Sequence, residues 1–291
     1  MGSIRAHAPS DPAKRLKIVL LSSRDKPRAA EEAARLLPLV AQYADAQSRD
    51  LADDLSRLEF DLGVVLGGDG SMLRAAHQMG RQQRPLLGVN LGNLGFLADL
   101  SPEEFLAKLS HVCSPPVKTT SHLMYECRVV RNGRTVHEQL GLNEVAVLAG
   151  PPFAILDVDL YVDSELVTTY SCDGLIVSTP IGSTAHSLSA GGPILRQDLQ
   201  AFVISPVSPH TLTNRPVVDS ADRVFEMAIA RPHEGTSVVA DGRVVCRVEP
   251  GDRVRVERSA AQFQLVALTG HGYYRTLREK LGWGGRLKAS S

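Results

Sequence analysis

Apolar and polar residues follow different patterns in the two halves of the chain. The first half has short apolar runs typical of buried parallel strands, at residues 16–21, 62–66 and 86–90. Residues 29–47 are rich in Ala, Glu, Arg and Leu and predict a helix that breaks or kinks at Pro38. Further helices are predicted at residues 71–79 and after Ser101, which Pro and Glu follow at capping positions. Alternating strands and helices predict an α/β domain with a doubly wound parallel sheet.

From about residue 121 the pattern becomes that of a β-rich domain. Turn signals lie between β-forming runs at Asn132-Gly133, Asp163-Ser164 and Asp241-Gly242. Residues 273–281 have helical composition again. The chain is therefore divided into a disordered lead at 1–13, a Rossmann-like α/β domain at 14–120, a β-rich domain at 121–268, and a C-terminal segment at 269–291 that packs back on the first domain.

Composition excludes several functional classes. Among 291 residues, Lys and Arg together number 32 and so do Asp and Glu, so net charge favours neither nucleic acid nor an anionic membrane as a partner. No apolar run approaches the roughly 20 residues of a membrane span. The four cysteines form no C-x-x-C pair, which favours reduced thiols in a cytoplasmic protein. The histidines show no metal-binding spacing, and the sequence assigns no metal ligand.

The first candidate site is the glycine cluster LGGDG, which follows the apolar run 62–66. Gly67, Gly68 and Gly70 would let backbone N–H groups approach a phosphate closely at the start of a helix. The cluster matches neither the dinucleotide fingerprint nor the P-loop. Two interpretations of Asp69 are open: a cap in a tight turn, or a base that accepts a hydroxyl proton during phosphoryl transfer.

A second cluster, DGLIVSTPIGSTAHSLSAGGP, spans residues 173–193. Ser183 lies in no G-x-S-x-G elbow, which argues against a serine hydrolase. The many hydroxyl groups and glycines of this cluster suit a loop that binds a nucleoside with its ribose.

Taken together, the motifs resemble those of bacterial NAD kinases, in the same order, over residues 14 to 285. They are GGDG (67–70), LGFL (94–97), LNEV (142–145), DGLIVSTPxGSTA (173–185), LSAGGP (188–193), SPHTLTNRPVV (208–218) and LREKLGWGG (277–285). The resemblance implies a two-domain NAD kinase fold and phosphorylation of NAD at the 2′-hydroxyl of its adenosine ribose. It also implies ATP, or polyphosphate in some members, as donor, a divalent cation (Mg²⁺ or Mn²⁺), and a homodimer or homotetramer.

The resemblance also assigns residues. Asp69 falls at the proposed general base, and Gly67, Gly68 and Gly70 lie beside the phosphates. Asp69 and Gly70 are also expected to contact NAD. The other residues expected to bind NAD are Phe96, Asn143, Glu144, Asp173, Thr184, Ala185, His186 and Ser189. From the sequence alone, local capping at a hairpin end is favoured over a binding role for Asn143 and Glu144.

Four positions depart from the family pattern. Ile181 replaces a common Thr and His186 a common Tyr, Ser171 stands where a basic residue is common, and Arg243 where Gln is common. An imidazole can still stack on adenine, but it also titrates near neutral pH. These changes leave open the preference between NAD and NADH and among donors. The competing hypotheses are a GGDG-type lipid or sugar kinase and a non-catalytic dinucleotide sensor.

Overall fold

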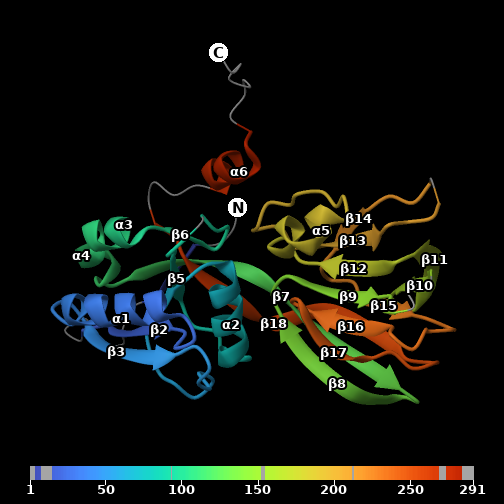
Figure 1. The fold of residues 1–291 in the computed structure, drawn as a ribbon, viewed down its shortest axis with the longest axis horizontal. Helices are drawn as coiled ribbons and strands as arrows, with labels where there is room; N and C mark the ends of the chain where they lie inside the picture. Colours follow the sequence, from blue (N-terminus) through green and yellow to red (C-terminus); the bar gives the residue numbers. More distant parts are fainter. Residues whose placement is uncertain are drawn as a thin grey trace. The chain divides into compact units, whose positions relative to one another are not determined.

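A computed structural model describes residues 4–7 (backbone only), 15–92, 94–151, 155–211, 213–268 and 273–283. The described chain forms two compact units. The α/β unit contains the residues up to 121 together with 263–268 and 273–283, and the β-rich unit contains residues 122–262. Two long strands, β7 (Val117–Arg131) and β18 (Arg253–Val266), run from one unit into the other. Figure 1 shows the strands and helices of each unit.

The α/β unit is built on a parallel sheet in the order β3-β2-β4-β5, to which β6 and the end of β18 add by pairing with β5. Its strands are β1 (Ile4–His7), β2 (Lys17–Ser22), β3 (Asp45–Asp50), β4 (Leu62–Leu66), β5 (Leu86–Val89) and β6 (Ala98–Leu100). Its helices are α1 (Pro27–Val40), α2 (Asp69–Met79), α3 (Pro102–Ala107), α4 (Leu109–Val112) and α6 (Tyr273–Leu281). None of the described helices is long and apolar enough to cross a membrane.

The burial pattern explains this order. Strands β4 and β5 are buried at every position, as expected for strands covered on both faces. Helix α1 buries Ala29, Ala33, Leu36 and Val40, which recur every three or four residues and so lie on one face. Ser101 caps α3 reciprocally with Glu104, as the sequence predicts.

Two predictions in this unit were wrong. The helix predicted over residues 29–47 begins at Pro27, continues through Pro38 and ends at Val40, after which β3 forms. Strand β3 lies at the edge of the sheet and needs no apolar face, so its sequence is polar. For that reason the apolar pattern did not predict it. Within the predicted disordered lead, Ile4–His7 forms strand β1, which pairs with β7; residues 1–3 and 8–14 lie outside the described part of the chain.

The β-rich unit contains a six-stranded sheet in the order β14-β13-β12-β9-β16-β17 and further antiparallel pairs. Its strands are β8 (Arg134–Gly141), β9 (Glu144–Leu148), β10 (Leu156–Val162), β11 (Glu165–Cys172), β12 (Gly174–Ser178), β13 (Ala201–Val207), β14 (Val217–Ser220), β15 (Phe225–Ala228), β16 (Ser237–Ala240) and β17 (Arg243–Arg247). A 3₁₀ turn (Gly182–Thr184) and the short helix α5 (His186–Ser189) follow β12.

The three predicted hairpin turns are confirmed. Asn132-Gly133, Asp163-Ser164 and Asp241-Gly242 each have two consecutive residues with positive φ, between 46° and 76°. Each turn joins two strands paired antiparallel. The predicted fold class, an α/β domain followed by a β-rich domain, is confirmed as well.

Candidate active site

The glycine loop connects β4 to α2, and the physical reason for glycine differs among its three glycine positions. Gly67 has φ of +146°, and a Cβ there would lie 2.4 Å from the Ser71 hydroxyl oxygen, so the turn itself requires glycine. A Cβ on Gly68 or Gly70 would meet no described protein atom within 4 Å. Internal packing therefore does not explain these two glycines, whereas close approach of a ligand to the backbone would.

Asp69 is the first residue of α2, and its carboxylate holds the segment before β6. Oδ2 accepts a hydrogen bond from the Phe96 N–H at 2.8 Å. Oδ1 accepts from the N–H groups of Leu97 and Ala98 at 2.9 and 3.1 Å. Gly95 makes this approach possible, because a Cβ there would lie 2.1 Å from Asp69 Oδ1. Asp69 thus anchors the LGFL segment, a role that is neither of the two interpretations from the sequence, a turn cap or a general base.

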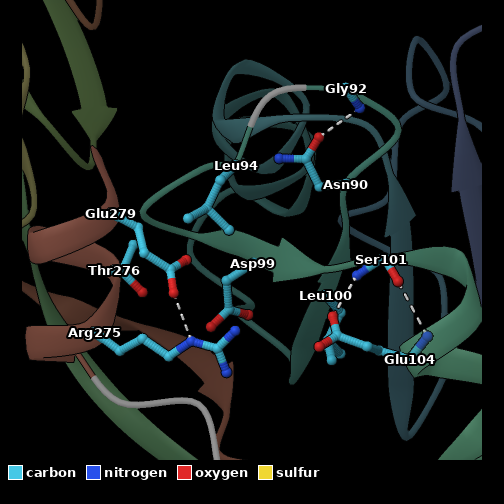
Figure 2. A pocket seen from close by; sticks show the side chains of 10 residues that line it. All are labelled: Asn90, Gly92, Leu94, Asp99, Leu100, Ser101, Glu104, Arg275, Thr276 and Glu279. Atoms are coloured by element: carbon cyan, nitrogen blue, oxygen red, sulfur yellow. Dashed lines mark hydrogen bonds and ion pairs between the residues drawn. The ribbon is translucent and has the colours of Figure 1, made fainter. Parts of the chain in front are cut away.

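Helix α6 and the segment around β6 enclose a pocket of about 180 Å³ within the α/β unit. Figure 2 shows Arg275, Thr276 and Glu279 of α6 facing the segment that carries Leu94 and Asp99. An Arg275–Glu279 ion pair at 2.8 Å links two successive turns of the helix. The LGFL segment that binds Asp69 is therefore packed against α6.

In the β-rich unit, pairing of β9 with β12 joins the two predicted dinucleotide motifs. Glu144 is opposite Ser178 in this antiparallel pair. The Thr179 N–H donates to the Asn143 carbonyl at 2.8 Å, and a Cβ on Gly182 would lie 2.0 Å from that oxygen. The structure thereby brings Asn143 and Glu144 to the start of the segment that carries Thr184, Ala185 and His186, with Ser189 one turn further on.

Asp241 orients the Asn143-Glu144 segment, and sequence analysis assigned it only to a turn. Its carboxylate accepts from the N–H groups of Leu142 and Asn143, both at 2.8 Å, and of Glu144 at 3.1 Å. The hydroxyl of the fully buried Tyr125 lies 2.9 Å from both Asp241 Oδ1 and the Glu144 carbonyl oxygen. Asp241 lies about 100 residues away in the chain, so no local sequence signal could have revealed this contact.

Glu144 is 6% exposed, and its Oε2 atom has no hydrogen-bond partner among the described residues. Burial, followed by the nearby charge of Asp241, raises the pKa of Glu144 to about 8, although the backbone N–H of His186 opposes this shift. At neutral pH this side chain therefore carries a proton, and it can donate a hydrogen bond as well as accept one.

This raised pKa predicts a pH-dependent stability. Between pH 5 and 8 the folded chain holds a proton on Glu144 that the unfolded chain has lost, so the free energy of unfolding falls as pH rises. In this range, the contribution of Glu144 to the free energy of unfolding falls by about 1.4 kcal/mol per pH unit. Urea unfolding at pH 5, 6.5 and 8 should show this decline for the wild type relative to Glu144→Gln, which cannot titrate. Parallel pH profiles for the two proteins would contradict the assignment.

Asp173 lies apart from Asn143, Glu144 and the loop that follows β12. It precedes Gly174, which pairs with Leu148, whereas Glu144 pairs with the far end of β12. Ser178 is five residue steps from Asp173 along the strand, roughly 17 Å. Its carboxylate instead lies 3.6 Å from the Nε2 atom of His210. A contact between Asp173 and the dinucleotide stays a prediction.

The structure accounts for two of the four departures from the family pattern, those at Ile181 and Ser171. Ile181 is 4% exposed and is part of the protein interior. The Ser171 hydroxyl donates a hydrogen bond to the Asp157 carboxylate. His186 is half-buried and approaches Glu144 through its backbone N–H, a bond that does not depend on the side chain. Arg243 is exposed at the start of β17, and no described contact explains it.

Comparison with known proteins identifies the class and then the family. The chain has the two domains of an ATP-dependent kinase: the model of the ATP-NAD kinase N-terminal domain matches residues 17–116, and that of the ATP-NAD kinase C-terminal domain matches residues 142–268. The chain is 53% identical to an NAD kinase from Rhodopirellula baltica, over 93% of this chain and 88% of that protein. It is 38% identical to an NAD kinase from Geotalea daltonii, over 86% and 87% of the two chains. The chain belongs to the ATP-NAD kinase family.

Two solved structures have the same fold. A yeast NADH kinase in complex with NADH aligns with a TM-score of 0.85 at 22% identity, over 100% of this chain and 97% of the other. An NAD kinase from Archaeoglobus fulgidus in complex with ATP aligns with a TM-score of 0.73 at 28% identity, over 93% and 100% of the two chains. The family predicted from the motifs is confirmed.

Proposed function

We propose that the protein is an NAD kinase that transfers the γ-phosphoryl group of ATP to the 2′-hydroxyl of the adenosine ribose of NAD, giving NADP. One observation carries this proposal: both family models match, one in each unit, in a chain 53% identical to a curated NAD kinase. The structures solved with NADH and with ATP support both substrates as ligands of this fold.

In the proposed reaction, the ribose 2′-oxygen attacks the γ-phosphorus. The bond from that phosphorus to the β,γ-bridging oxygen breaks, and its electron pair leaves with ADP. Asp69 takes the hydroxyl proton, and the N–H groups of Gly68 and Gly70 stabilise charge on the phosphoryl oxygens. The open approach to these two glycines supports this role.

The proposed NAD site uses Asn143, Glu144 and the loop of Thr184, Ala185, His186 and Ser189, together with Phe96 and Asp173. A neutral Glu144 supports the binding of a ribose hydroxyl, because the protonated carboxyl both donates and accepts hydrogen bonds.

The divalent cation is proposed to arrive with the nucleotide. Among the described residues, no group of three or more His, Cys, Asp or Glu side chains is placed to hold a metal ion. Mg²⁺ commonly binds through substrate phosphates and water with few protein carboxylates, which fits ATP carrying Mg²⁺ or Mn²⁺ into the site. The cation would neutralise phosphate charge there. Polyphosphate remains an alternative donor.

We also propose a homodimer or homotetramer in the cytoplasm. Exposed apolar side chains on two edge strands support the oligomer: Leu166 and Val167 of β11 are 53% and 56% exposed, and Val217 and Val218 of β14 are 47% and 46% exposed. Such strand edges bury apolar surface when they pair with another chain.

The deciding experiment incubates the purified chain with ATP, Mg²⁺ and NAD and measures NADP with an NADP-specific dehydrogenase. We expect NADP formation, with NADH, polyphosphate and Mn²⁺ tested in parallel. NAD binding without NADP under every donor and metal would indicate a dinucleotide sensor. Phosphorylation of diacylglycerol, sphingosine or a sugar in place of NAD would indicate a different GGDG kinase.

A further inference from the structure

Lys280 of α6 lies at the glycine loop, although it is almost at the end of the described chain. Its Nζ atom is 4.0 Å from Asp69 Oδ2 and 4.6 Å from the centroid of the Phe96 ring. The Lys280 and Asp69 side chains are 29% and 32% exposed, so both remain reachable from solvent. All three residues belong to the α/β unit.

Packing of α6 fixes the position of this ammonium group. Leu277 and Thr276, three and four residues before Lys280, are 2% and 8% exposed and lie on the same face of the helix. The Arg275–Glu279 ion pair adds a link between turns. The face of Phe96 attracts the ammonium by a cation–π interaction and so confines the long side chain.

The ammonium retains capacity to bind a ligand. A separation of 4.0 Å is an ion pair but exceeds hydrogen-bond distance, so the Asp69 carboxylate takes up none of the three N–H donors of Lys280. Asp69 Oδ2 accepts instead from the Phe96 N–H. In the described part of the chain, Asp69 and Phe96 are the groups this ammonium contacts.

We propose that Lys280 is a catalytic residue that binds the terminal phosphate of the triphosphate donor. This inference rests on the proposed function. A polyanionic donor that approaches Gly68 and Gly70 is repelled by the Asp69 carboxylate, and Lys280 supplies the compensating positive charge at that place. During transfer, its N–H groups stabilise the negative charge on the equatorial oxygens of the moving phosphoryl group.

The test compares Lys280→Met, which keeps the apolar stem, with Arg278→Met, which removes one charge from an exposed position of the same helix. We expect Lys280→Met to lower kcat/KM for ATP by roughly 10²- to 10³-fold, the usual effect of losing one such donor. KM for NAD should stay within a factor of about three in both variants, and Arg278→Met should retain near-normal turnover. Lys280→Arg should recover part of the loss because it restores the charge.

Binding measurements separate a phosphate-binding role from a structural one. By calorimetry with Mg²⁺, Lys280→Met should weaken ATP binding more than ADP binding, because only ATP has the γ-phosphate. Equal weakening of ATP and ADP, or turnover equal to that of Arg278→Met, would overturn the proposal. The binding comparison does not depend on NADP formation, so a wild-type chain that makes no NADP would refute the proposed function separately.

Discussion

Replacement of Asp69 with Asn is expected to lower kcat for NADP formation by at least roughly 10²-fold, the usual scale for loss of a general base. The carboxylate lies at the start of α2 beside the two glycines that ligands can approach. An amide of nearly the same shape cannot accept the ribose proton. Steady-state kinetics with saturating ATP and NAD measure this loss.

The contacts of Asp69 add a second consequence to this substitution. Both carboxylate oxygens accept backbone N–H groups, from Phe96 on one side and from Leu97 and Ala98 on the other. An Asn side chain in either orientation places an NH₂ group against at least one of these donors. Some displacement of the LGFL segment is therefore expected, with a rise in KM for NAD where Phe96 contributes to its binding.

Two controls separate these effects. Asp99→Asn makes the same chemical change four residues from Gly95 and should leave kcat within a factor of about three. Gly95→Ala keeps the carboxylate but places a methyl group 2.1 Å from its Oδ1 atom, which displaces it. Near-normal turnover of Asp69→Asn would rule Asp69 out as the base. A loss for Asp69→Asn no greater than that for Gly95→Ala would assign its effect to the anchored segment alone.

Replacement of Asp241 with Ala is expected to reduce the free energy of unfolding by about 3–5 kcal/mol and to raise KM for NAD at least tenfold. The substitution leaves the N–H groups of Leu142, Asn143 and Glu144 without their acceptor. It also removes one acceptor of the buried Tyr125 hydroxyl. Because this segment opens β9, its displacement moves Asn143 and Glu144 away from the loop after β12.

Asp163→Ala is the matched control for this second prediction. Asp163 occupies the same kind of turn, with φ of 50° against 46° at Asp241, so both substitutions carry the same backbone cost. Its exposed side chain pairs with Arg223 and accepts one backbone N–H, from Val224, so its loss should destabilise the fold much less than loss of Asp241. Chemical denaturation and NAD titration check both variants. Equal destabilisation by the two substitutions would refute the positioning role of Asp241.

Local patterns were sufficient for much of the fold. Consecutive apolar residues predicted β4 with its exact bounds, and the turn residues located all three hairpins. These signals work because burial on both faces and positive φ each restrict the residues allowed at a position. Strand β3 was not predicted, because an exposed edge position does not restrict the residues allowed there in this way.

The sequence by itself determined the family, the two-domain organisation and the motifs around Asp69, Asn143 and Glu144, because these depend on residue types in a fixed local order. Only the tertiary structure decided how the motifs are held. Asp241 reaches Glu144 from 97 residues away, and Lys280 reaches Asp69 from more than 200. The protonated state of Glu144 likewise depends on burial and on the charge of Asp241. Contacts between residues distant in the chain leave no local pattern, so they appear only once the strands and helices have packed.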